Sequence, residues 1–225
     1  MKKSKEYSPK VKRLLRSLKK QYKKTSPPEY SDPLDALIYA VLCEKLDDKT
    51  ANNTLEKFKQ NFIDLNDLRV SRSEEIIELI NQEPQISKQI AWALTGILNS
   101  VFNRYNIISL KSLKKAKKRS ARKIIEKFNG ITPFAVNYCM LTAIKAHAIP
   151  VNEKMVQFLK RKDCLDPDAD INEANAFLNR LIPAKDAYEF YALLRRKSET
   201  VMKEKKKTTR KTKKKTKRKT KKRKK

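Results

Sequence analysis

Apolar residues recur at helical spacing along most of this chain. The first pattern places five of them on one face of a basic segment: Val11, Leu14, Leu15, Leu18 and Tyr22. Asp32 before Pro33 then indicates a helix start, because aspartate caps free N–H groups and proline fits the first helical position. Further helical patterns cover residues 48–62, 71–80, 87–101, 110–128, 133–146, 170–181 and 184–197. With two glycines in 225 residues, the pattern predicts an all-α fold.

Several aromatic residues fall inside these apolar patterns. Trp92 lies in the middle of the pattern at 87–101, and we expect it in the core rather than on a base-stacking surface. Four further rings have helical spacing and apolar neighbours, and we expect them in the core as well: Tyr138, Tyr188, Phe190 and Tyr191.

The positive charge of the chain is concentrated at its two ends. Residues 203–225 hold 17 Lys and Arg against Glu204, and residues 1–24 hold 11 against Glu6. The pattern predicts a basic helix and linker over 1–30, a helical domain over 31–197 and a disordered Lys-rich tail over 198–225. We expect the tail to contact phosphates, most clearly through Lys213, Lys214, Lys215, Lys217 and Arg218. A solubility tail, a localisation signal or anionic membrane are the alternatives for such a block.

Other sequence features limit the class of protein. No stretch approaches the roughly 20 apolar residues of a membrane span, and no apolar segment follows the basic start, so we expect neither membrane insertion nor secretion. Cys43, Cys139 and Cys164 lack metal-ligand spacing, so we expect free thiols and no metal site. The expectation is an intracellular monomer, in a bacterial cytoplasm and nucleoid or in a nucleus.

The segment from Ile124 to Tyr138 reads as two helices joined by a short turn that contains Gly130. N–H groups at the start of a second helix can hold a phosphate, and such contacts do not read the base sequence. The turn is therefore a candidate phosphate-binding site. The expected contacts in and beside the turn are Lys127, Asn129, Gly130, Ile131, Thr132 and Phe134.

This segment resembles the helix-hairpin-helix of the endonuclease III family of DNA glycosylases. About twenty residues later that family has a Pro-Val-Asp step, and this chain has Pro150-Val151-Asn152 at the matching distance. The resemblance covers residues 10–196 and implies a two-lobed helical fold that binds duplex DNA and takes part in base excision repair. It also matches Lys45 to a glutamine that the family wedges into the duplex. We expect Lys45 and Lys154 to contact DNA.

The departures from the family concern its chemistry. The resemblance places Phe134 where bifunctional members have a lysine that attacks the sugar, and phenylalanine has no amine. It places Asn152 at the catalytic aspartate, and an amide cannot act as a base. Thr132 stands at the second hairpin glycine. The family's iron–sulfur loop needs four cysteines, more than the chain holds, so we expect no cofactor.

These departures predict DNA binding by a glycosylase fold with lost or altered catalysis. One alternative is an active monofunctional glycosylase that uses Glu153 as a shifted acid. Another is an architectural protein of chromatin or the nucleoid, for which the helical part would orient two basic ends on DNA. RNA is a further possible partner, from charge alone. His147 has no second ligand nearby in sequence, so a metal or catalytic role is not expected.

Overall fold

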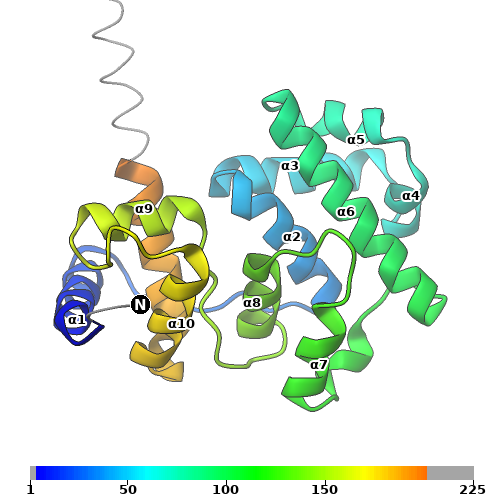
Figure 1. Ribbon diagram of the computed structural model, residues 1–225. Helices are drawn as coiled ribbons and strands as arrows, with labels where there is room; N and C mark the ends of the chain where they lie inside the picture. Colours follow the sequence, from blue (N-terminus) through cyan, green and yellow to red (C-terminus); the bar gives the residue numbers. More distant parts are fainter. Residues whose placement is uncertain (1–3, 202–225) are drawn as a thin grey trace, which may run out of the picture.

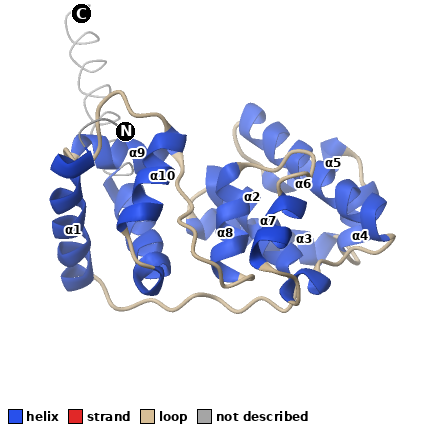
Figure 2. Cartoon of the chain, turned by 60° about the horizontal axis from the view of Figure 1, so that its bottom comes forward, coloured by secondary structure: helices blue, strands red, loops and turns tan. Residues whose placement is uncertain are grey.

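The computed structural model describes residues 4–201, and over that range the regular elements are helices (Figure 2). The prediction of an all-α fold is confirmed. The helices run in the order α1 Ser4–Gln21, α2 Pro33–Lys45, α3 Asp48–Asn61, α4 Leu65–Val70, α5 Ser73–Ile80, α6 Pro84–Tyr105, the short 3-10 helix η1 Lys111–Lys114, α7 Lys118–Ile125, α8 Pro133–Thr142, α9 Glu153–Arg161 and α10 Ile171–Leu181. A last helix begins at residue 184 and is described to residue 201.

Side-chain caps fix where several of these helices begin. The Asp32 carboxylate accepts the Leu34 N–H at 2.9 Å, with Pro33 at the first position of α2. The same carboxylate accepts the Leu110 N–H at 2.9 Å, so one buried acid ties the start of α2 to the segment before η1. Asp170 starts α10 with a full capping box, in which Glu173 returns the bond.

The helices form two groups that lie side by side (Figure 1). One contains α2 to α8, in which α2 packs against α8 and α6 packs against α2, α4 and α5. The other contains α1, α9, α10 and the last helix. The basic helix α1 buries Val11, Leu15 and Leu18 of the predicted stripe together with Tyr7, whereas Leu14 and Tyr22 are only half-buried and Tyr22 lies just beyond the helix. This arrangement agrees with the expected two-lobed core.

Three expectations from the sequence differ from the structure. Residues 110–128 do not form one helix: η1 and α7 are separated by an extended Lys117. The break follows from anchors at its start, where Leu110 is held by Asp32, and from a run of like charges that disfavours a continuous helix. Trp92 is 67% exposed, so the prediction of a core position is wrong.

The third difference lies at the C-terminal end. The last helix continues to residue 201, past the expected start of the tail at residue 198. An ion pair from Arg195 to Glu199 at 2.9 Å, one helical turn apart, supports this extension. The Lys-rich residues of the tail, from Lys213 to Arg218, lie outside the described residues.

Within residues 4–201, no helix combines the length and the apolar character that crossing a membrane requires. The same range holds no group of His, Cys, Asp or Glu side chains arranged to bind a metal ion. Cys43, Cys139 and Cys164 are buried, and their thiols form no disulfide within the described residues.

Candidate nucleic-acid interface

The two hairpin helices are α7 and α8, joined by the hairpin turn at residues 126–132. Thr132 caps α8 by accepting the Ala135 N–H at 3.1 Å, and Pro133 occupies the first helical position. Arg122 on α7 donates to the buried amide oxygen of Asn137 on α8 at 2.8 Å. A charge-assisted bond between side chains therefore fixes the two helices relative to each other.

The hairpin turn leaves several backbone N–H groups without a partner. The Asn129 N–H donates to the Ser100 hydroxyl, and the Ile131 N–H donates to the Phe128 carbonyl. The N–H groups of Gly130, Thr132 and Phe134, in contrast, make no hydrogen bond within the described residues. Three open donors at the start of a helix form the arrangement that binds an anion such as phosphate.

The two glycines of the whole chain meet at this turn. Gly130 has a φ of 77°, and a Cβ there would lie 2.8 Å from the Cα of Ala93 on α6. A Cβ on Gly96 would lie 2.7 Å from the carbonyl oxygen of Asn129. Neither contact can relax, because the opposing atoms belong to the backbone. Glycine at both positions therefore lets α6 support the turn directly.

The segment that leads into the turn is strongly basic. Residues 111–127 contain nine Lys and Arg and one acid, Glu126, which pairs with Arg122 at 3.3 Å. Most of these basic side chains are exposed, Lys127 among them. The sequence pattern over 110–128 showed this charge, and Lys123 and Lys127 are its members nearest in the chain to the open N–H groups. Such a surface attracts polyanions.

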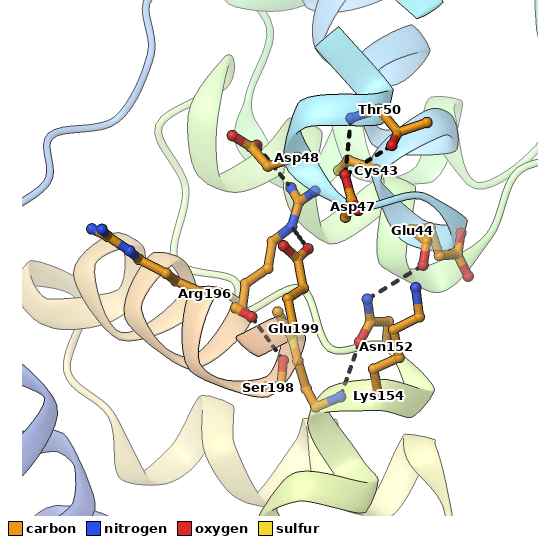
Figure 3. Close-up of polar contacts among 12 residues, drawn as sticks. Cys43, Glu44, Asp47, Asp48, Thr50, Asn152, Lys154, Arg196, Ser198 and Glu199 are labelled. Carbon is orange, nitrogen blue, oxygen red and sulfur yellow. Dashed lines mark hydrogen bonds and ion pairs between the residues drawn. The ribbon is translucent and has the colours of Figure 1, made fainter. Parts of the chain in front are cut away.

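The end of α2 contacts both the hairpin turn and the start of α9; Figure 3 shows the contact between Glu44 and Asn152. The Glu44 carboxylate accepts the Thr132 hydroxyl at 2.6 Å, and the Glu44 carbonyl accepts the Asn152 side-chain amide at 3.3 Å. The Lys154 ammonium donates to the Lys45 carbonyl at 2.8 Å, where a cation suits a helix C-terminus. We call these contacts the Glu44 clasp.

Glu44 was not singled out from the sequence. Burial raises the pKa of its carboxyl, while the Thr132 hydroxyl and Lys45 act in the opposite direction. The feature of the sequence that could have identified Glu44 is an acidic residue among the apolar residues at the end of α2, directly before Lys45. That signal does not identify Thr132, 88 residues away, as its partner.

The two positions that match the family's catalytic residues serve as structural positions here. Phe134 is buried, with ring centroids 6.4 Å from Tyr138 and 6.2 Å from Tyr191. The expected contact of its side chain with DNA is therefore not available, because an aromatic ring at this position packs inward. Asn152 is buried and caps α9 by accepting the Met155 N–H at 3.0 Å. Glu153, the alternative acid, is exposed on the first turn of α9.

A pocket of about 750 Å³ lies behind this aromatic cluster, between the linker, α2, α3, α4, α8 and the last helix. Its walls include Tyr30, Tyr39, Tyr138 and Tyr188. Next to it, buried Arg195 contacts Asp48 at 3.8 Å, while its Nη2 has no partner within the described residues. An apolar pocket with a few polar groups is typical of a small-molecule site.

Beyond Gly130 and the buried Phe134, the expected DNA contacts within the described residues fall into two sets. Four lie at the surface of the hairpin, with exposed Lys127 and Asn129 and half-buried Ile131 and Thr132. Lys45 and Lys154 are half-buried and joined within the Glu44 clasp. His147 bonds to the Ile182 carbonyl at 2.9 Å, a structural contact.

The sequence matches no protein-family model and no curated protein. Solved structures do match. A trapped covalent intermediate of endonuclease III with DNA has a TM-score of 0.66 and 16% identity, with 83% of this chain and 84% of that chain covered. An 8-oxoguanine glycosylase/lyase of Clostridium acetobutylicum in complex with double-stranded DNA has a TM-score of 0.67 and 13% identity, covering 87% of this chain and 70% of that chain.

The 3-methyladenine DNA glycosylase of H. pylori, bound to 1,N6-ethenoadenine, is also similar. Its TM-score is 0.58 at 17% identity, and 85% of this chain and 94% of that chain are covered. At such low identity these similarities show the fold alone. Together with the hairpin geometry, they show that this chain adopts the helix-hairpin-helix fold of the DNA glycosylases.

Proposed function

We propose that this chain binds duplex DNA along the phosphate backbone without reading its sequence, in the setting of base excision repair. The observation that carries the proposal is the hairpin turn, with open N–H groups at Gly130, Thr132 and Phe134 beside a basic surface. These donors suit a phosphate oxygen and cannot distinguish one base from another. Structural neighbours named as DNA complexes support the same proposal.

The proposal is tested by introducing a negative charge at the hairpin turn and, as a matched control, at a distant exposed position. Asn129→Glu adds a carboxylate to an exposed position in the turn, and Asn172→Glu adds the same group to an exposed position on α10. We expect the first variant to lower duplex affinity about tenfold, or about 1.4 kcal/mol, and the second to change it little. Fluorescence anisotropy with a labelled duplex measures both. Equal affinities of the two variants would contradict the proposal.

The ends of the chain are proposed to add long-range attraction. Removing residues 203–225 removes a net charge of +16, from 17 Lys and Arg less Glu204. We expect weaker binding and a flatter dependence of affinity on salt, because fewer counterions are released. An unchanged salt dependence would exclude the tail from binding.

The architectural alternative is tested by comparing damaged, abasic and intact duplexes. Equal affinity for all three would favour that alternative.

Cleavage of DNA by lysine chemistry is not part of the proposed function. Phe134 carries no amine and lies in the aromatic cluster, so it cannot form a Schiff base with an abasic sugar. Incubation with an abasic duplex and borohydride should therefore trap no covalent adduct at this position. A trapped adduct mapped by peptide sequencing to α8 would contradict this statement.

Hydrolytic base excision is a second candidate function, favoured by one observation. Tyr138, which lines the pocket, lies one helical turn after Phe134 on α8. The pocket is large enough for a nucleobase. Release of free base from a panel of damaged duplexes tests it directly. Because binding and base release are measured separately, failure of one does not imply failure of the other.

A further inference from the structure

Trp92 is the one tryptophan of the chain, and it lies 67% exposed on α6. Its neighbours Ala91 and Ala93 are buried, so the helix itself is firmly packed at this point. A large aromatic ring left in water on a packed helix is unusual for a side chain whose role is stability. Its surroundings suggest a different role.

The position of Trp92 relative to the hairpin turn follows from the helix. Trp92, Gly96 and Ser100 are spaced by four residues and share one face of α6. Gly96 packs against the Asn129 carbonyl, and the Ser100 hydroxyl accepts the Asn129 N–H at 2.9 Å. Trp92 therefore lies on the same face of α6 as the two residues that contact the hairpin turn, one helical turn nearer to the start of α6. The hairpin turn does not cover it.

A basic residue extends the same row. Lys88 lies four residues before Trp92, is exposed, and forms no ion pair within the described residues. The row Lys88, Trp92, Gly96 and Ser100, which we call the α6 ridge, therefore begins with a cation, continues with an aromatic ring and ends at the hairpin turn. Successive members are one helical turn apart, about 5.4–6 Å.

We propose that the α6 ridge is a second DNA contact, in which the Trp92 indole packs against the strand whose phosphate the hairpin turn holds. The inference rests on the proposed function of the turn. A phosphate bound by the Gly130 and Thr132 N–H groups brings the adjoining sugars and bases within reach of side chains beside the turn. Aromatic rings pack on such groups whatever the base, and Lys88 supplies charge for a neighbouring phosphate.

Trp92 itself reports the contact, because no other tryptophan contributes emission. The full chain is titrated with duplex DNA while tryptophan emission and the anisotropy of a labelled duplex are followed together. We expect Trp92 emission to be quenched or shifted with the same midpoint as the anisotropy. Binding seen by anisotropy with unchanged emission would overturn the inference and leave the proposed function intact. No binding by either signal would overturn both.

Two further readings are outcomes of the same titration. Emission that changes with protein concentration in the absence of DNA would assign the α6 ridge to a second copy of the chain. A duplex RNA that shifts the emission at lower concentration than DNA would assign it to RNA. Either result would overturn the proposed contact.

Variants separate the aromatic contribution from the charge. Trp92→Ala should lower duplex affinity about tenfold at every salt concentration, as removal of an aromatic stacking partner does, and Trp92→Phe should retain most of it. Lys88→Ala should instead lower the salt slope by about one phosphate contact. The control is Val70→Ala, an exposed apolar residue outside the α6 ridge and outside the pocket, which should bind as the unaltered chain does. Equal affinities of Trp92→Ala and Val70→Ala would overturn the inference.

Discussion

The hairpin turn and the two positions that match catalytic residues lie close together but are built in opposite ways. At the turn, three backbone N–H groups remain open and two glycines let α6 approach the backbone. At the matched positions, the Phe134 ring is buried and both polar atoms of the Asn152 side chain are bonded. Binding through the backbone depends on geometry, which many side chains permit. Catalysis depends on particular side-chain groups, and Phe134 and Asn152 carry neither an amine nor a carboxylate.

The largest expected effect tests whether Phe134 has become part of the core. Phe134→Ala removes a buried ring that contacts Tyr138 and Tyr191. We expect a loss of about 3–5 kcal/mol in the free energy of unfolding, measured by urea denaturation. A loss below about 1 kcal/mol would show that the ring is loosely packed and that the position could still serve another purpose.

Gly130→Ala tests the other half of the comparison. The positive φ and the contact with the α6 backbone should together cost about 2–4 kcal/mol, and duplex affinity should fall as the turn shifts. Adding Ala93→Gly should not restore stability, because the opposing atom is the Cα rather than the methyl group. Full rescue by that second substitution would contradict the close approach of the two backbones.

Substitutions of Asn152 distinguish its role as a helix cap from a role in catalysis. Asn152→Ala removes the cap of α9 and should cost about 1 kcal/mol, whereas Asn152→Asp keeps the accepting oxygen. The aspartate loses the bond to the Glu44 carbonyl, so we expect it to be less stable than the unaltered chain at neutral pH. Base release by the Asn152→Asp variant on a panel of damaged duplexes would show that a working pocket needs only this carboxylate.

The smallest expected effect concerns the Glu44 clasp. Burial raises the pKa of Glu44 in the folded chain above its unfolded value, so the stability it contributes is fully present below the unfolded pKa and is lost as pH rises through the folded pKa. Glu44→Gln retains an acceptor for Thr132 and removes this titration. The variant should gain stability relative to the unaltered chain between pH 4 and pH 7, measured as the difference in Tm. A constant difference across that range would contradict a raised pKa.

Local features of the fold could be predicted from the sequence because they depend on nearby residues. The apolar spacing gave the helices, Asp32-Pro33 gave the start of α2, and Gly130 gave the turn. The identities of Phe134 and Asn152 were sufficient to predict altered chemistry once the resemblance was stated, and that prediction remains to be tested. Helix ends and the break near Lys117 were less predictable, because contacts distant in sequence decide them.

What the sequence determined by itself is the helical class, the charge and the absence of particular side-chain groups, since these follow from residue identity and short-range spacing. What only the tertiary structure decided is which residues meet. Gly96 and Gly130 support one turn, Glu44 reaches Thr132, and Trp92 faces solvent although its pattern suggested the core. The physical reason is that helical periodicity defines the faces of a helix, whereas packing between helices decides which face is covered.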